Sequence, residues 1–402
     1  MTTTPPSWVL QGVLHDGEWD NCAELTRCVE IDGLFVDLPP RDRERFTLLG
    51  CRPAGALADL LDRLPAEALG TEAAWLGHLS VTAPEPPAGQ SPQWFGEDLL
   101  DVVVLGQRPS AATPGAVDID LDGFVFVYEP ADEVERPADV AEFALVGYGE
   151  AAYGTCQDVS GVFREQGEPP VPVVRLLGCR PTEPLLTAVA ALEKSGPEAW
   201  ERRRIRADVE AVLADGSTIN LIGGMVHGYV EACTPSSLGE GLLDVTVDSC
   251  PVTPLPTGYL DLLAHWRAGR PTEKNTWAGF SSELRHHWAG LALSSVPKGP
   301  DRPPGGTYHL DGRFVTDVHG FFCALGEAVN GPGGYYGWNF YAVHDCLTSA
   351  GFGARGPFRL IWHDSAVARE HLAPSHDPRT MAFTLDDLVA SLTEDGVGVE
   401  LR

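Results

Sequence analysis

The sequence predicts two kinds of fold in one chain: a duplicated α+β region, followed by an α/β domain with a three-stranded parallel sheet and helices. Three observations lead to this prediction. A block of six residues occurs twice in the first half of the chain, proline and glycine are dense at 296–306, and strand and helix patterns alternate over 307–402. The chain has 402 residues, more than one domain usually holds, so we expect several domains.

The repeated block, Leu-Leu-Gly-Cys-Arg-Pro, occupies residues 48–53 and again 176–181. After each copy, leucine or valine recurs at the spacing of one helix face. A second pair of similar segments, 96–102 and 239–245, follows in the same order. Because order and content match twice, we interpret this region as two related α+β units.

The repeat and the composition between its copies set the expected domain boundaries. The related units span about 8–130 and 142–265. The acidic, proline-containing segment 129–137 lies between them and indicates a surface connection. Proline and glycine are too dense at 296–306 for a helix or a strand, which indicates a linker. The expected domains are 1–137, 138–295 with a helical extension, the linker 296–306, and 307–402.

The C-terminal domain begins with a short strand pattern at 307–310, closed by an Asp-Gly turn. Thr316 is the expected N-cap of the first helix, whose apolar side chains recur with a period near 3.6 residues. A segment rich in glycine and proline, 331–334, ends this helix. A second helix is expected at about 339–349, with Asn339 as its N-cap.

The remaining elements of this domain complete a small sheet. Residues 358–362 are rich in aromatic and branched aliphatic side chains and predict a central strand. Thr384 opens the last helix in the manner of a capping box, with Asp387 three residues later. Residues 397–401 predict the last strand. Helical connections between successive strands favour a parallel arrangement.

The formal net charge of −29 dominates the expected surface. A surface so acidic repels the phosphates of DNA and RNA, so we expect no direct binding to nucleic acid. It attracts basic proteins and speeds their association. The alternative is that the charge only keeps the protein soluble.

Nine cysteines are scattered along the chain, and none forms a Cys-x-x-Cys pair. This pattern is typical of reduced thiols rather than of a disulfide framework or a zinc site. The N-terminal residues lack a basic segment followed by an apolar stretch, so we expect no secretory signal. No apolar run reaches the ~20 residues that a membrane helix needs. We therefore expect a cytoplasmic protein that does not enter a membrane.

The sequence offers only weak candidates for catalysis. Cys51 and Cys179 precede predicted helices, where a thiol pKa can fall, but the presence of this cysteine in both copies favours a structural role. His286 and His287 are adjacent and therefore diverge on a helix, which disfavours a metal site. The Gly-Gly pair at 223–224 lacks the context of a phosphate loop. We expect no catalytic residue, no cofactor and no metal, and we predict that the protein is not an enzyme.

The segment 335–345 is the best candidate for a functional site. Gly337 can adopt a left-handed conformation just before the second helix. Tyr341 and Asp345 are four residues apart and share the outward face of that helix, with His344 beside them. Aromatic side chains with an acid suit a protein interface; the alternative is that the tyrosines and Gly337 only build a tight turn. The candidate partner-binding residues are Tyr335, Gly337, Trp338, Asn339, Tyr341, His344 and Asp345.

About the last hundred residues, 303–402, resemble the barstar family of intracellular ribonuclease inhibitors. The resemblance rests on the Tyr-Tyr-Gly-x-Asn segment, the helix after it, and the order of the surrounding strands and helices. It implies that Tyr335, Gly337 and Asn339 line a loop that enters the ribonuclease cleft. It also implies that the acid at Asp345 occupies the pocket of an RNA phosphate, where it meets basic side chains.

The chain departs from the family at several positions of this interface. Tyr341 and Trp338 stand where the family usually carries acids, and His344 stands at a tryptophan position. A further acid expected on the last helix falls at Ser391, although the acidic residues 394–395 are near. These departures reduce the negative charge of the interface that the resemblance implies.

The resemblance and the acidic surface together predict a non-enzymatic, protein-binding inhibitor. It would block a basic ribonuclease or a ribonuclease-like toxin by inserting an acidic and aromatic helix and loop into the active site. One alternative is an enzyme in the duplicated region, with the barstar-like domain as a recruitment module. Another is a scaffold protein that has lost nuclease binding. Turnover by residues 1–295, or capture of a basic nuclease, would discriminate between these hypotheses.

Overall fold

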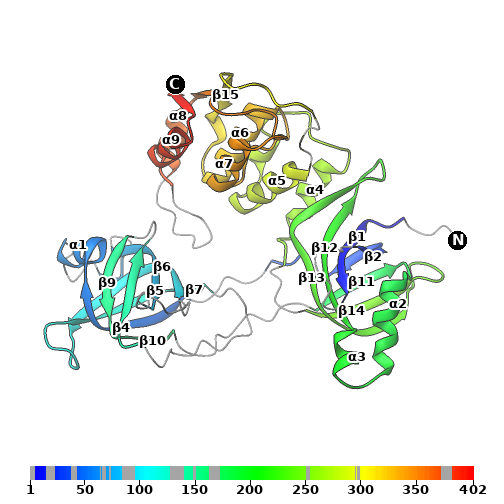
Figure 1. The fold of residues 1–402 in the computed structure, drawn as a ribbon, viewed down its shortest axis with the longest axis horizontal. Coiled ribbons are helices and arrows are strands. Elements are labelled where there is room, and N and C mark those ends of the chain that lie inside the picture. Colours follow the sequence, from blue (N-terminus) through cyan, green and yellow to red (C-terminus); the bar gives the residue numbers. More distant parts are fainter. Residues whose placement is uncertain are drawn as a thin grey trace, which may run out of the picture. The chain divides into compact units, whose positions relative to one another are not determined.

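The computed structural model describes residues 5–14, 23–37, 43–63, 65, 69–71, 74–83, 96–126, 140–147, 151–162, 173–249, 254–294, 296, 299–372 and 383–402. The chain divides into two compact units. The first comprises residues 1–38, 170–374 and 382–402, and the second comprises 39–169 and 375–381. The first unit contains a seven-stranded antiparallel sheet and the C-terminal α/β domain, and the second contains another seven-stranded antiparallel sheet (Figure 1).

The sheet of the second unit closes on itself. Backbone pairing joins its end strand β9 to β4, so six strands form a barrel and β10 lies outside it. Helix α1 (Gly55–Arg63) buries three leucines and packs beside β9 and β5. In sheet order the strands are β10 (Asp158–Ser160), β4 (Glu44–Pro53), β7 (Val117–Phe126), β6 (Gly96–Pro109), β5 (Trp75–Thr82), β8 (Phe143–Gly147) and β9 (Ala152–Cys156).

The sheet of the first unit closes in the same way. The amide of Val29 donates to the carbonyl of Leu177 at 2.9 Å, and the amide of Arg180 donates to the carbonyl of Arg27 at 2.8 Å, which joins β2 to β11. In sheet order the strands are β2 (Ala23–Cys28), β1 (Trp8–Leu14), β12 (Arg204–Val212), β13 (Thr218–Pro235), β14 (Leu243–Ser249), β11 (Val174–Cys179) and β3 (Glu30–Asp32). The helices α2 (Glu183–Ala190), η5 (Ala191–Glu193) and α3 (Pro197–Glu201) follow β11 in the chain.

The two sheets exchange strands. Strands β1–β3 lie in the sheet of β11–β14, and strands β8–β10 lie in the sheet of β4–β7. Figure 1 shows the blue strands β1 and β2 in one sheet with the green strands β12 and β13. The order of strands is the same in both sheets when β1–β7 are matched with β8–β14. The compact units therefore do not follow the expected division at 1–137 and 138–295, because each sheet takes three strands from one half of the chain and four from the other. The expected connection 129–137 lies outside the described residues.

The repeated six-residue block has the same local structure in both sheets. Its glycine, Gly50 or Gly178, has a left-handed backbone (φ 61° and 67°) at a β-bulge. The amide of Gly50 donates to Asp118 at 2.9 Å, and that of Gly178 donates to Asp244 at 2.8 Å. The left-handed backbone explains why a glycine is needed at the bulge, and in each copy a carboxylate accepts the amide of that glycine.

The cysteine of each block faces a second cysteine where the barrel closes. Cys51 lies against Cys156, and Cys179 lies against Cys28, and all four side chains are fully buried. The contact with the facing thiol and burial raise the pKa of Cys51 and of Cys28. All cysteines in the described ranges are free thiols. Because all four side chains are buried and apolar in their surroundings, they pack as core residues rather than as exposed nucleophiles.

The C-terminal domain has a parallel sheet of three strands, as the sequence predicts. The strands are β15 (Thr307–Asp311), β16 (Arg359–His363) and β17 (Gly398–Leu401), in that order. The helices are α6 (Val318–Asn330), α7 (Phe340–Thr348), α8 (Ser365–His371) and α9 (Leu385–Glu394), with the short η7 (Gly312–Phe314) after β15. The expected capping box of α9 is present, formed by Thr384 and Asp387.

The N-cap of α6 is Asp317 rather than the expected Thr316. The carboxylate of Asp317 accepts a hydrogen bond from the amide of Gly320 at 2.7 Å. The hydroxyl of Thr316 is used elsewhere, because it accepts a hydrogen bond from the guanidinium of Arg285 at 2.9 Å. Threonine and aspartate are both common N-caps, and the guanidinium of Arg285 bonds to both of these residues.

Helices upstream of this domain connect it to the sheet of the first unit. They are α4 (Tyr259–Trp266), η6 (Thr276–Gly279) and α5 (Ser282–Ser294), where the sequence predicts a helical extension. Helix α5 packs against both β13 and α6 (Figure 1). None of the helices in the described ranges is long and apolar enough to cross a membrane.

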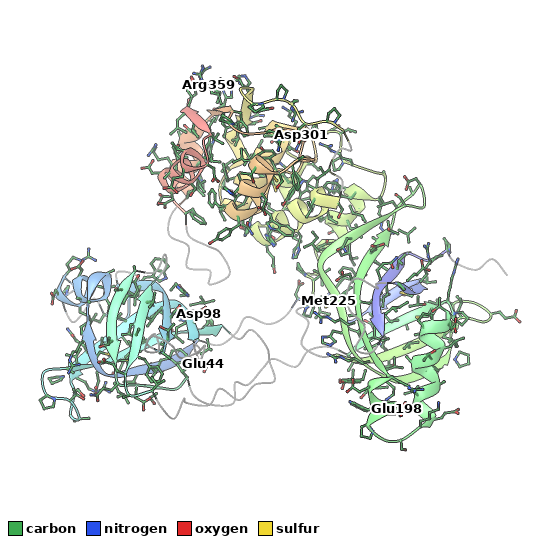
Figure 2. The ribbon with its side chains drawn as sticks, in the orientation of Figure 1. Glu44, Asp98, Glu198, Met225, Asp301 and Arg359 are labelled. Atoms are coloured by element: carbon green, nitrogen blue, oxygen red, sulfur yellow. The ribbon has the colours of Figure 1, made fainter. Side chains whose placement is uncertain are left out.

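The C-terminal half of the expected linker 296–306 is bound to the domain. The amide of Arg302 donates to the carbonyl of Gly353 at 3.0 Å, and the amide of Gly305 donates to that of Pro357 at 2.7 Å. The carboxylate of Asp301, labelled in Figure 2, accepts from the amides of Gly351 and Gly353 at 2.9 and 2.8 Å. These bonds attach residues 301–305 to the loop before β16. Residues 301–305 are therefore part of the C-terminal domain.

The strand exchange predicts that the two halves of the chain stay together after cleavage. A specific protease site placed within 129–137 and then cut should yield two fragments that elute as one species in native gel filtration, because each sheet contains strands of both fragments. The fragments should separate in denaturant. Two separate native peaks would show that each half builds its own sheet.

Candidate protein-binding face of the C-terminal domain

The start of α7 is fixed by two residues of the predicted site. Asn339 is extended (φ −150°, ψ 173°), and its side-chain oxygen accepts from the amide of Ala342 at 2.8 Å. Gly337 has φ 95°, and a Cβ there would lie 2.5 Å from a methyl group of Val343. Gly337 and Asn339 therefore shape the backbone that leads into α7.

The two tyrosines before α7 lie in the interior. Tyr335 is 4% exposed and Tyr336 is fully buried. The hydroxyl of Tyr336 donates to the carbonyl of Ala354 at 2.9 Å, and burial raises the pKa of both tyrosines. The side-chain amide of Asn330 donates to the carbonyl of Tyr335 at 2.7 Å and holds this segment to the end of α6. The sequence places Tyr335 at the partner-binding surface, but in this structure its ring packs inward.

Trp338 also turns away from the outward face of α7. Its ring makes an edge contact with Tyr335, with centroids 6.3 Å apart, and lies 5.8 Å from the ring of His286 on α5. A Cβ on Gly290 of α5 would lie 3.6 Å from the Trp338 ring. The side chain is partly buried between the loop and α5.

Three predicted residues come together on the exposed face of α7. Tyr341 is 84% exposed, and His344 and Asp345 are exposed beside it. Val343 is buried on the opposite side of the helix, as the sequence predicts. We call Tyr341, His344 and Asp345 the α7 face.

An acid from the last helix joins the α7 face. Asp395, at the C-terminal end of α9, lies with its carboxylate 2.7 Å from Nδ1 of His344. The hydrogen bond and the charge of Asp395 raise the pKa of His344 above its ordinary value of 6.5. The family resemblance places an acid of this helix at the position of Ser391, with the acidic residues 394–395 nearby. In the structure it is Asp395 that lies against His344.

The surface around α7 contains the groups that a protein interface needs and no metal cluster. In the part of the chain that the structure describes, no group of three histidines, cysteines or carboxylates is arranged to hold a metal ion. An exposed tyrosine with a carboxylate one turn along the same helix is suited to contact a basic protein surface. The ordered loop before α7, residues 331–339, presents this helix from a fixed backbone.

Comparison with known families decides the identity of this domain. Residues 306–402 match the family model Barstar (barnase inhibitor). These residues are a barstar domain. A barstar domain is a non-enzymatic inhibitor, and its family binds barnase-type ribonucleases. No curated protein and no solved structure matches the chain, and residues 1–305 carry no family assignment.

The N-cap of α7 predicts a local loss of stability when it is removed from the barstar domain. Asn339→Ala should lower the free energy of opening α7 by about 1 kcal/mol, because the amide of Ala342 loses its acceptor. Hydrogen exchange at the amides of α7 should then be about five-fold faster. Asn339→Asp keeps an acceptor and should exchange at nearly the native rate. Equal exchange in the alanine variant and the native protein would contradict the assigned cap.

Proposed function

We propose that this protein is a cytoplasmic inhibitor that binds a basic, barnase-type ribonuclease through the α7 face of its barstar domain. The observation that carries the proposal is the exposure of Tyr341, His344 and Asp345 together on a helix of that domain. The cytoplasmic location is an expectation from the sequence alone.

The proposed mechanism is occupation of the ribonuclease active site by a carboxylate. A ribonuclease cleft is basic because it binds RNA phosphates. Asp345 would accept charge-assisted hydrogen bonds from basic groups in that cleft, in place of a phosphate. Tyr341 would supply a large contact area beside it, in the manner of tyrosines at other protein interfaces. The net charge of −29 would speed the encounter with a basic partner.

The proposed interface differs from the one that the family resemblance implies. Tyr335 and Trp338 pack inward, so the proposal assigns the direct contacts to the α7 face. His344 is held by Asp395 and brings a titratable positive charge next to Asp345. The partner that fits this face has a basic centre with an apolar margin for Tyr341.

Removal of the central carboxylate tests the proposal. Asp345→Ala in the full chain should weaken binding to a barnase-type ribonuclease by about 2 kcal/mol or more, because hydrogen bonds to a charged group are lost. The affinity can be measured by inhibition of RNA hydrolysis. The fold should be unchanged, because Asp345 is exposed.

A charge-matched control separates local contact from overall charge. Asp261→Ala removes an exposed acid of α4 and should leave the affinity nearly unchanged. Equal affinities of the native protein and Asp345→Ala would place the interface elsewhere. An absence of binding by the native protein would exclude a barnase-type ribonuclease as its target.

The histidine of the α7 face predicts a pH dependence of binding. Because Asp395 raises the pKa of His344, this histidine is positively charged in a fraction of the molecules near neutral pH. As pH rises through the raised pKa of His344, above its ordinary value of 6.5, the side chain loses its proton, the face becomes more negative, and affinity for a basic partner should increase.

Titration of the ribonuclease itself must be separated from this effect. The glutamine of His344→Gln has no proton that titrates near neutral pH. The ratio of native to variant affinity, measured with the same enzyme, should therefore rise a few-fold as pH rises through the pKa of His344. A ratio independent of pH would show that His344 does not contribute to binding.

A further inference from the structure

We propose that residues 270–294, which precede the barstar domain, hold its recognition loop and are part of the inhibitor module. The recognition loop is residues 331–339, between α6 and α7. We call Arg270, Pro271, Asn275 and helix α5 the upstream clamp. The proposal rests on the proposed function, because the loop it concerns leads into the α7 face.

Arg270 binds the main chain at the start of the recognition loop. Its Nε donates to the carbonyl of Pro332 at 2.8 Å. One Nη donates to the carbonyls of Asn330 and Gly331, at 2.5 and 3.4 Å. These carbonyls lie at the C-terminal end of α6, where backbone acceptors lack partners within the helix and a positive charge is favoured. One side chain thus holds three consecutive peptide groups of the loop.

The carboxylate of Glu327 on α6 connects the recognition loop to the upstream clamp. Glu327 is 5% exposed, and its carboxylate accepts from the amide of Asn275 at 2.9 Å and from the amide of Gly333 at 3.4 Å. Burial raises the pKa of Glu327, and the two amide donors oppose that rise. A buried carboxylate needs such donors, and here one comes from the clamp and the other from the loop.

Packing supports the same connection. Gly333 has φ 60°, and a Cβ there would lie 2.9 Å from the ring of Pro271. At the other end of the loop, Trp338 lies against α5 near Gly290. The clamp therefore contacts both ends of the recognition loop. The aromatic side chains of the loop turn inward.

The clamp is itself attached firmly to the barstar domain. Arg285 on α5 is 9% exposed, and its guanidinium donates to the carboxylate of Asp317 at 2.5 Å. It also donates to the carbonyl of Ala278 at 2.9 Å. Trp277 and Trp288 are almost completely buried. The family match begins at residue 306, but the contacts that shape the loop begin at Arg270.

A loop that is ordered before binding loses less conformational entropy when it binds. If the clamp is released, only a fraction of molecules has the competent loop, and the apparent Kd rises by the inverse of that fraction. Arg270 is then a positioning residue, which acts on the α7 face through the backbone of the loop.

The test compares Arg270→Ala with Arg359→Ala in the full chain. Arg359 lies on β16 and pairs with Glu400; its side chain is 59% exposed, and it is labelled in Figure 2. Both variants lose one positive charge, which by itself should favour a basic partner. In Arg270→Ala, hydrogen exchange of amides 331–338 in the free protein should be about ten-fold faster. Affinity for a barnase-type ribonuclease should fall about ten-fold, although the loss of a positive charge alone would raise it. Arg359→Ala should show neither change.

A double variant distinguishes positioning through the loop from a direct contact of Arg270 with the partner. Because the competent fraction multiplies the intrinsic affinity, the effects of Arg270→Ala and Asp345→Ala on the free energy of binding should add. A smaller effect of Asp345→Ala in the Arg270→Ala background would contradict the positioning role. Arg270→Lys keeps the charge but cannot hold three carbonyls in the same way, and it should show smaller changes in the same direction. If Arg270→Ala does not fold, Arg270→Lys replaces it in the comparison with Arg359→Ala and in the double variant.

The exchange measurement is independent of the identity of the partner. Native exchange of amides 331–338 in both Arg270→Ala and Arg270→Lys would overturn the clamp, whatever the ribonuclease does. If the native protein does not bind the ribonuclease but exchange accelerates in the variants, the proposed function fails and the clamp stands.

Discussion

The buried guanidinium of Arg285 joins the upstream helices to the barstar domain. It bonds to the N-cap carboxylate of α6, to the hydroxyl beside it and to the end of η6. Removing one partner of such a buried pair typically costs 3–5 kcal/mol, since the other charge is left without compensation. The position of α5, the packing of Trp338 and the start of α6 all depend on this contact. The barstar domain in this chain is therefore built together with its neighbour.

The sequence predicts the barstar domain well because the relevant signals are local. Asn339 caps α7 and Thr384 caps α9, as expected, and each contacts residues only a few positions away. Thr316 is not the cap of α6: Asp317 has that role, and the hydroxyl of Thr316 bonds to Arg285, some thirty residues upstream. The inward positions of Tyr335 and Trp338 likewise depend on packing that no local pattern contains.

The exchange of strands could not be predicted for a related reason. The repeat identifies matching segments, but alternation of apolar and polar residues does not show which copy a strand will pair with. The roles of Arg270 and Glu327 were also missed. A glutamate within an apolar helix, such as Glu327, is a usable signal, because a buried carboxylate requires donors from elsewhere.

The exchange of strands has a consequence for synthesis on the ribosome. Strands β1–β3 are made first, but their sheet partners β11–β14 follow only at residues 174–249. The sheet of the second unit, whose last strand ends at Ser160, can be completed earlier. Strands β1 and β2 can pair with each other at once, but the edges that pair with β12 and β11 must wait while a whole barrel is made between them and their partners. Long waiting of this kind favours slow folding and exposes strand edges to other chains. The N-terminal strands of the first unit are consequently those whose sheet edges stay exposed longest while the chain is being made.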